Sequence, residues 1–369
     1  MAGIYIHIPF CRQACHYCNF HFSTSLRYKN EFVNALLKET ELQKNYLLDE
    51  PVETIYFGGG TPSLLEIEDL KLQIDRIRSI FPVSKFAEIT LEANPDDISE
   101  KKLSDWKDAG INRLSIGVQS FFDEDLKWMN RAHNAGQAIA NLQLAIQYFN
   151  NITIDLIYGT PLLTNEKWNQ NVATAIGLSV PHLSCYALTV EEKTPLYKLI
   201  RQHEKEDINP DKQSEQFLLL MQWLGNSGYE HYEISNFAKP GFRSRHNASY
   251  WQGKKYLGLG PSAHSFNGSS RQWNIANNNI YIESINKGVI PFEKEELTPT
   301  QQLNEYIMIS LRTTEGLNLA KIDEAASDKL QAASKRYIEN GLIKLNENHL
   351  ILTNEGKLLA DGITAALFF

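Results

Sequence analysis

The sequence GIYIHIPFCRQACHYC, residues 3–18, places three cysteines, Cys11, Cys15 and Cys18, within eight residues of one another. They directly follow an apolar segment with the composition of a β-strand. Thiolates this close together hold a metal ion or a cluster, because they are too near in sequence to join distant parts of a chain. No fourth ligand is evident, and a metal centre that lacks one ligand keeps a position open to a small molecule. The segment therefore predicts a metal centre that performs chemistry.

This cysteine segment fits three kinds of site. The spacing favours a 4Fe–4S cluster with one iron free of protein ligands, and Tyr17 suits this interpretation because an aromatic ring can pack beside a cluster. A structural zinc ion would need a fourth ligand, which His16 or His21 could supply. A group of redox or structural thiols is the third interpretation.

The bulk composition excludes several classes of protein. The chain has 369 residues and a net charge of −8, whereas a protein that coats nucleic acid needs a basic face. No apolar run approaches the ~20 residues of a membrane span, and the N-terminus lacks the sections of a secretory signal. Only Cys185 remains beside the cysteine triplet, so no disulfide framework is available. We therefore expect a cytoplasmic protein with no nucleic-acid partner.

The first two thirds of the chain alternate between strand and helix patterns. This alternation predicts an α/β fold with a parallel sheet and helices outside it, and six repeats suit a partial (β/α)6 barrel. The expected strands are 4–8, 54–57, 88–92, 113–119, 153–158 and 183–188, and the expected helices include 28–46, 64–81, 100–109 and 138–149, with Ser99 as an N-cap.

The last third of the chain changes composition twice. Segment 236–297 is rich in Asn, Gly, Ser and aromatic residues, which indicates an irregular connector. Segment 298–369 shows helical patterns and one hairpin, so we expect a winged-helix-like α+β domain that packs on the barrel, which would occupy residues 1–235. Within it the expected helices are 300–312, 319–325, 327–340 and 354–367, and the expected hairpin is 342–352.

Polar residues gather where the expected strands end. Cys11 follows the first strand, the run GGGTP at 58–62 follows the second, Glu92 and Gln119 end the next two, and Asp155 lies in the fifth. The chemistry of a parallel barrel sits at the carboxyl ends of its strands, so these residues should share one mouth. Three consecutive glycines also leave bare backbone that a ligand can approach and bond.

Together these motifs identify a resemblance. The cysteine spacing followed by GGGTP resembles the radical S-adenosylmethionine superfamily, whose signature it matches. The runs EANPDD (92–97), IGVQSF (116–121), NRAH (130–133) and DLIYGTP (155–161) resemble its coproporphyrinogen-dehydrogenase (HemN) branch, essentially from end to end. The resemblance implies a radical-SAM barrel, a 4Fe–4S cluster on Cys11, Cys15 and Cys18, and S-adenosylmethionine bound to the fourth iron.

The resemblance also implies roles for individual residues around S-adenosylmethionine. A cationic sulfonium and a zwitterionic amino-acid end suit carboxylates and one arginine, although structural ion pairs are the alternative role for those charged side chains. Cleavage of the cofactor to a 5′-deoxyadenosyl radical requires an electron at the low end of the iron–sulfur range, so a low-potential electron donor is expected. The implied contacts are Tyr5, Tyr17, Gly59, Gly60, Thr61, Glu92, Gln119, Arg131, Asp155 and Ala187.

Two groups within the branch differ in function. HemN oxidases convert coproporphyrinogen III to protoporphyrinogen IX, and HemW-type proteins are haem chaperones. The chain has Phe20 where the oxidases carry a further cysteine, only ten residues precede Cys11, and residues 246–251 match the His-Asn-x-x-Tyr-Trp motif of the chaperones. All three features favour a haem chaperone. The oxidase and a zinc-stabilised regulator are the alternatives, and whether the chain is an enzyme stays open.

The last motif predicts a haem contact. His246 could be an axial ligand to iron, and Tyr250 and Trp251 offer flat apolar area to a porphyrin. The alternative is a histidine packed among core aromatics. His264 could be a second ligand or structural, and His7 could support the cysteine loop. The expected partners are haem or a porphyrin(ogen), a haem-accepting protein and the electron donor, with a peripheral membrane contact left open.

Overall fold

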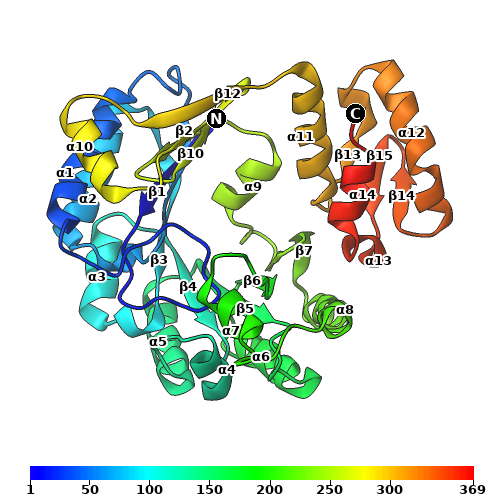
Figure 1. Cartoon of the computed structure of the whole chain (residues 1–369), viewed down its shortest axis with the longest axis horizontal. Coiled ribbons are helices and arrows are strands. Elements are labelled where there is room, and N and C mark those ends of the chain that lie inside the picture. Colours follow the sequence, from blue (N-terminus) through cyan, green and yellow to red (C-terminus); the bar gives the residue numbers. More distant parts are fainter.

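The computed structural model describes residues 1–369, and its main body is one twelve-stranded sheet (Figure 1). The central six strands are parallel and run in sequence order, which confirms the predicted partial α/β barrel. These strands are β1 (Ala2–Ile8), β2 (Val52–Gly59), β3 (Val83–Ala93), β4 (Arg113–Gln119), β5 (Ile152–Tyr158) and β6 (His182–Ala187).

Helices cover the outer face of this sheet, and one contiguous hydrophobic core lies between the two layers. The Ser99 hydroxyl accepts a hydrogen bond from the backbone N–H of Lys102, so the predicted N-cap is confirmed. The predicted helices and strands exist, and their ends differ by a few residues. The larger barrel helices are α1 (Lys29–Leu42), α2 (Ile67–Ile80), α3 (Glu100–Asp108), α5 (Ala135–Tyr148), α6 (Asn165–Gly177) and α8 (Pro210–Asn226), with the shorter α4 (Asp123–Trp128) and α7 (Pro195–Arg201) between them.

Segment 236–297 is more regular than its composition indicates. It extends the sheet at both edges, because β9 pairs parallel with β1 while β8 pairs antiparallel with β6. These strands have only three to five residues, too few to show a clear period-2 pattern without their partners. The strand just before this segment is β7 (Glu230–Glu233). The elements within it are β8 (Asn236–Ala238), α9 (Arg245–Trp251), β9 (Tyr256–Leu259), β10 (His264–Phe266), β11 (Ser270–Asn274), α10 (Asn278–Asn286) and β12 (Phe292–Glu296).

The C-terminal unit stands beside the barrel with its own three-stranded antiparallel sheet and its own small core (Figure 1). The structure departs from the predicted helices at two places. In place of the expected helix 319–325 there is a single 3-10 turn, Leu319–Lys321, and Asp323 then caps the next helix, which begins at Glu324. The expected last helix breaks after Lys357. The elements are α11 (Pro299–Leu311), β13 (Leu317–Asn318), α12 (Glu324–Glu339), β14 (Ile343–Asn346), β15 (His349–Leu352), α13 (Asn354–Lys357) and α14 (Ala360–Ala366).

The division of the chain at residues 235/236 and 297/298 stays a prediction. None of the helices combines the length and the apolar character that crossing a bilayer requires.

A buried carboxylate joins helix α1 to the late strands. Glu39 accepts hydrogen bonds from the Gly260 N–H at 2.7 Å, the Tyr281 hydroxyl at 2.6 Å and the Asn274 amide at 2.6 Å. Burial raises the pKa of Glu39 to about 6, and these three donors oppose that rise. One side chain thus ties β9, β11 and α10 to the first helix of the barrel.

We expect Glu39→Gln to destabilise the chain by about 1–3 kcal/mol, because the new amide presents N–H groups to a site built from donors. Glu41→Gln, on the same helix but exposed, is the matched control. It removes only a surface ion pair with Arg76, so it should change the free energy of unfolding little. Denaturant unfolding of both variants checks this. Equal stability for the two would mean that the late strands do not depend on this carboxylate.

Candidate cluster and cofactor site

A cavity of about 550 Å³ opens at the carboxyl ends of the parallel strands. The residues predicted from separate strands converge there, because parallel strands place these ends at one edge. Tyr5 and His246 are the two predicted residues that do not line it. Those that do are Cys11, Cys15, Tyr17, Cys18, Gly59, Gly60, Thr61, Glu92, Gln119, Arg131, Asp155 and Ala187.

The cysteine loop is tied to the segment after helix α4. The Asn130 side chain donates to the carbonyl of Ala14 at 2.7 Å, and the Gln13 amide donates to the Asn130 carbonyl at 2.9 Å. The backbone N–H of His16 also donates to the carbonyl of Met129. In Figure 1 the loop is the dark-blue segment that crosses in front of β3 and β4. Asn130 therefore gives the NRAH run a structural purpose that the sequence did not reveal.

Two polar side chains contact the cysteine sulfurs. The Thr61 hydroxyl lies 3.5 Å from Cys11 Sγ, and Arg131 Nη1 lies 3.3 Å from Cys15 Sγ. Burial raises the pKa of the Cys11 thiol to about 11, so a bound metal or cation is needed to favour the thiolate. A site with three thiols, one arginine and no further protein ligand fits a cluster that leaves one iron to a small molecule.

The zinc alternative required His16 or His21 as a fourth ligand. His16 Nδ1 lies 3.2 Å from the carbonyl oxygen of Trp128, and His21 Nε2 lies 2.7 Å from Asn278 Oδ1. Nowhere in the chain are three or more histidine, cysteine, aspartate or glutamate side chains close enough together to hold one metal ion. In a 4Fe–4S cluster each cysteine binds a different iron, so the three sulfurs need not meet at a point.

The glycine run packs directly on the chain that leads into the cysteine loop. A Cβ on Gly60 would lie 2.6 Å from the carbonyl oxygen of Phe10, and Gly59 has a φ of +105° with the His7 ring beside it. The N–H groups of Gly59, Gly60 and Thr61 donate within the chain, to Glu92, Ile8 and Phe10 respectively. The glycine run therefore offers a ligand space and carbonyl oxygens. The sequence also predicted N–H groups free to bond that ligand, but these three are already used within the chain.

Glu92 and Asp155 face the cavity without an ion-pair partner in the chain. Glu92 accepts hydrogen bonds from the Tyr56 hydroxyl at 2.7 Å and from the Gly59 N–H at 3.1 Å. Desolvation raises the pKa of Glu92 to about 7 and that of Asp155 to about 6. The alternative role of these carboxylates in structural ion pairs has no support in this geometry, and such shifts are typical of functional sites.

Arg131 and Gln119 lie on the same wall. Arg131 Nη2 donates to Asn94 Oδ1 and to the Gly117 carbonyl, both at 2.7 Å, while its buried Nε has no partner in the chain. Gln119 adopts a φ of +68° at a bulge between β4 and β5, and such backbone strain is concentrated at binding sites. Asn94, which lies within the quoted run EANPDD, is a lining residue that our sequence reasoning missed.

The mouth of the cavity carries an exposed aromatic residue. Phe20 lines the cavity and is 69% exposed. It stands at the position where the oxidases of this branch were expected to carry a further cysteine.

Tyr5 lies beneath the cavity, on β1. Its hydroxyl is 3.1 Å from His7 Nδ1, and His7 Nε2 is 2.8 Å from the carbonyl oxygen of His21. Tyr5 also stacks on Tyr56. These contacts let Tyr5 and His7 support the cysteine loop. Tyr5 does not line the cavity, and its expected contact with the cofactor stays a prediction.

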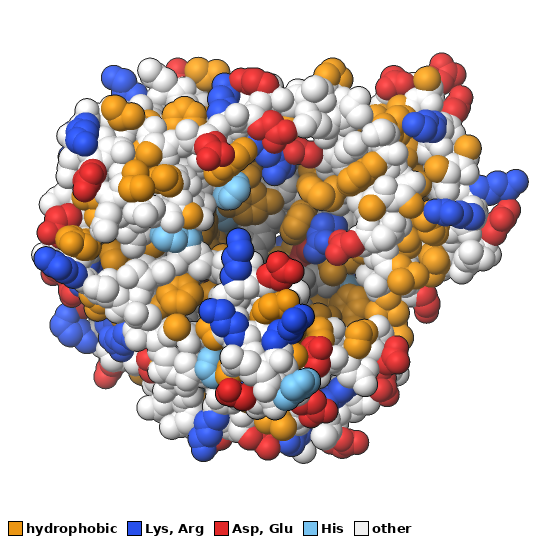
Figure 2. Space-filling view, viewed as in Figure 1, with side chains coloured by type: hydrophobic (Ala, Val, Ile, Leu, Met, Phe, Trp, Pro, Cys, Tyr) orange, Lys and Arg blue, Asp and Glu red, His pale blue; other side chains and the backbone are white.

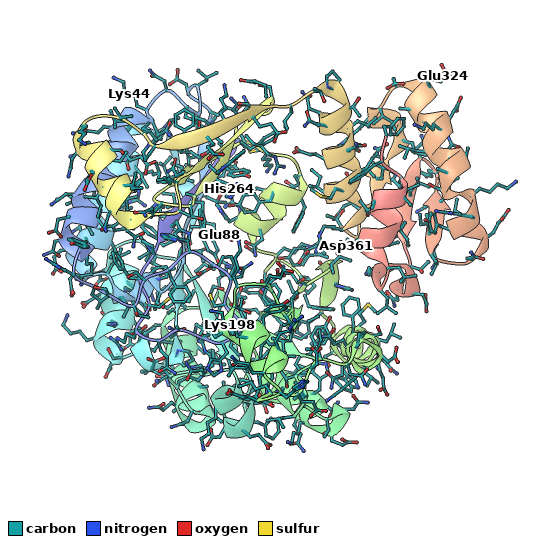
Figure 3. All side chains as sticks on the ribbon, viewed as in Figure 1. Lys44, Glu88, Lys198, His264, Glu324 and Asp361 are labelled. Atoms are coloured by element: carbon teal, nitrogen blue, oxygen red, sulfur yellow. The ribbon has the colours of Figure 1, made fainter.

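His246 is a packed histidine in this structure. Its Nδ1 lies 2.8 Å from the Thr54 hydroxyl and its Nε2 lies 2.8 Å from the Tyr250 hydroxyl, so both ring nitrogens are engaged. The ring stacks on Tyr56 and is almost completely buried, and burial lowers the pKa of His246 to about 3. The geometry therefore favours the packing alternative over the predicted role as haem ligand. His264 is exposed on β10 at the edge of the central hollow (Figure 3).

We expect Gly60→Ala to lower the iron content of the reconstituted chain, because the new methyl group would press on the backbone of Phe10 just before Cys11. Gly177→Ala is the matched control, since nothing lies within 4 Å of the position of its Cβ. Iron analysis after anaerobic reconstitution checks this. Full iron content in Gly60→Ala would contradict the importance of the close approach.

We expect Asp155→Asn to change the pH dependence of stability. The folded chain holds the Asp155 proton up to about pH 6 while the ordinary value is 3.8, so stability attributable to this group is lost as pH rises between those values. The neutral amide removes that loss, and the variant should gain about 1–2 kcal/mol over the parent at pH 7. Chemical unfolding of the cluster-free chains at pH 4.5 and 7 measures it. The exposed Asp328→Asn is the control, and parallel profiles for all three chains would contradict the shift.

Comparisons with known proteins agree with this geometry. Residues 5–174 match the model of the Radical SAM superfamily, and residues 297–359 match that of the HemN C-terminal domain. The chain is 35% identical to the "Heme chaperone HemW" of Bacillus subtilis (strain 168) over 374 residues, covering 99% of each chain. It is 34% identical to the protein of the same name from Mycobacterium tuberculosis (strain ATCC 25618 / H37Rv), covering 99% of this chain and 94% of that one.

A solved structure shares the fold over the whole length. It is described as "Coproporphyrinogen III oxidase (HemN) from Escherichia coli is a Radical SAM enzyme", and it matches with a TM-score of 0.85 at 23% identity, covering 100% of this chain and 90% of that one. The sequence relatives, the superfamily match and this common fold lead to one conclusion: the chain belongs to the HemW family of the radical SAM superfamily.

Proposed function

We propose that this chain is a haem chaperone that carries a 4Fe–4S cluster and S-adenosylmethionine. Membership of the radical SAM superfamily implies the cluster and the nucleotide. The observation that carries the proposal is the agreement of relatives named as haem chaperones along almost the full length of the chain. The similarity therefore extends over the cysteine loop, α9 and the C-terminal unit. A similarity confined to the barrel would not include all three.

Cys11, Cys15 and Cys18 would hold the cluster, and the cavity beside them would hold S-adenosylmethionine. Two carboxylates without ion-pair partners, Glu92 and Asp155, suit the ammonium group and the ribose hydroxyls of that ligand. Arg131 retains a buried N–H without a partner, which suits the ligand's carboxylate. When reduced, the cluster supplies the electron that breaks the sulfonium C–S bond of a bound S-adenosylmethionine.

The chain's own residues would orient the ligand and keep water away. The Gly59–Gly60 backbone gives it room, and Tyr17 is half-buried and lines the same cavity. Phe20 at the mouth would cover the bound molecule once it is in place.

The chaperone function requires partners that the chain itself does not contain. We propose that it takes up haem in the cytoplasm and delivers it to a haem-accepting protein, with a low-potential protein as electron donor. A recipient at a membrane would call for a peripheral contact there.

The oxygen-independent oxidation of coproporphyrinogen III is the second candidate, since the fold of the HemN structure extends over the whole chain. At 23% identity this likeness supports the fold alone. Phe20, in place of a further cysteine, favours the chaperone.

We expect the anaerobically reconstituted chain to bind ferric haem at about one haem per chain and to pass it to an apo-haem protein added in excess. It should produce no protoporphyrinogen from coproporphyrinogen III in the presence of S-adenosylmethionine and a strong reductant. Absorption spectroscopy follows the haem, and chromatography follows the tetrapyrroles.

The chain with serine at all three cluster cysteines is the control for the role of the cluster in transfer. Formation of the divinyl product would overturn the chaperone assignment in favour of the oxidase. Absence of haem binding by the parent chain would overturn it as well.

A further inference from the structure

A second cavity, separate from the cofactor cavity, lies between the barrel and the C-terminal unit. It has a volume of about 700 Å³, and its walls come from α9 and the neighbouring strands on one side and from α11, β13 and β15 on the other. Figure 2 shows the molecule hollowed on this face, where α9 and α11 lie opposite each other in Figure 1. We call it the interdomain cleft. Its volume is ample for one small-molecule ligand.

One part of the wall is aromatic, and two of its rings, Phe266 and Trp251, each have an arginine guanidinium over one face. Trp251, Tyr256, Phe266 and Tyr306 line the cleft, and they come from both sides of it. The indole N–H of Trp251 is buried and has no hydrogen-bond partner in the chain. Aromatic faces of this kind suit a large planar ring system better than a flexible or strongly hydrated ligand.

The charged residues of the wall leave two cations free. Arg243 is paired with Glu230 and Glu315, and Arg271 is paired with Glu305. Lys254 and Lys321 also line the cleft, and neither forms an ion pair in the chain. Two unpaired ammonium groups beside an aromatic wall match a planar ligand that carries two carboxylates.

One histidine lines the cleft. His349 begins β15, is half-buried, and its ring forms no hydrogen bond within the chain. It differs in this respect from His246, whose two ring nitrogens are both engaged. A free imidazole in an apolar cleft is a suitable ligand for a haem iron.

Helix α9 links the engaged ring of His246 to the aromatic wall of the interdomain cleft. Glu88 accepts the backbone N–H groups of Arg245 and His246, and the His246 ring bonds Thr54 of β2, so the first turn of α9 is fixed to the barrel. The other end of the helix presents Tyr250 and Trp251 to the cleft. The histidine of the motif therefore holds one wall in place, and the tryptophan forms part of its surface.

We propose that the interdomain cleft is the haem site, with His349 as the iron ligand, Lys254 and Lys321 receiving the two propionates, and His246 acting only as a positioning residue. This inference rests on the proposed chaperone function and adds the site to it.

The test uses the full cluster-loaded chain, titrated separately with ferric haem and with iron-free protoporphyrin IX and followed by difference absorption and by fluorescence quenching. We expect His349→Ala to shift the Soret band and to weaken haem binding about tenfold while protoporphyrin binding changes little, because only haem has an iron to ligate. Lys254→Ala with Lys321→Ala should weaken both ligands. Ile309→Trp, which fills the cleft, should abolish the binding of both.

His203→Ala and Lys344→Ala, exposed positions outside the cleft, are the matched controls and should bind as the parent does. His246→Ala should weaken binding of both ligands without moving the Soret band. A Soret band that moves in His246→Ala and stays in His349→Ala would overturn the ligand assignment. Unchanged haem binding in Ile309→Trp would overturn the cleft as the site while the chaperone function stood; a parent chain that binds no haem would instead remove the function itself.

Discussion

The close approach of two backbone segments at the top of the barrel governs the rest of the site. Gly60 lies against the carbonyl groups of Ile8 and Phe10, with no room for a side chain between them. The N–H groups of Gly60 and Thr61 bond the carbonyl groups of Ile8 and Phe10, so hydrogen bonding between the two chain segments continues beyond the paired strands β1 and β2. This contact fixes the point at which the chain enters the cysteine loop. The loop has little regular structure of its own, so its position depends on this contact and on the hydrogen bonds from Asn130. Precise positions for three sulfurs are thus obtained from rigid neighbours rather than from the loop itself.

The electrostatics of the cofactor cavity follow from the same arrangement. Glu92 lies on β3 and Asp155 on β5, with β4 between them, and desolvation raises the pKa of both carboxyl groups. Such groups cost stability when ionised and without partners, so their presence is better explained by a ligand that supplies the missing charge. Arg131 is held by Asn94 and Gly117, its Nη1 contacts Cys15, and its buried Nε has no partner in the chain. Ligands that pair with these charged groups should therefore stabilise the folded chain.

The sequence predicted the barrel and most of the cofactor cavity, because these depend on patterns that are local or that recur. Strand–helix alternation identified the six parallel strands, and Glu92 and Gln119 at the strand ends and Asp155 within the fifth strand were identified with them. Asn94 and Asn130 were missed as supporting residues because their roles appear only when residues more than thirty positions apart are brought together. The extra strands at the sheet edges were missed because three-residue strands have no readable period. For His246 a lone motif could not distinguish a free imidazole from one whose two nitrogens are both engaged.

The stacked rings of Tyr56 and His246 lie between two cavities whose lining residues come mostly from different parts of the chain. On one side the Tyr56 hydroxyl donates to Glu92, which lines the cofactor cavity; on the other side His246 contacts the hydroxyl of Tyr250, which lines the interdomain cleft. Four side chains thus form a single partition, and each face of it belongs to a different compartment. Replacing either ring in the middle should therefore disturb the lining of both compartments. Within this family, we therefore expect these four positions either to keep their residues or to change together.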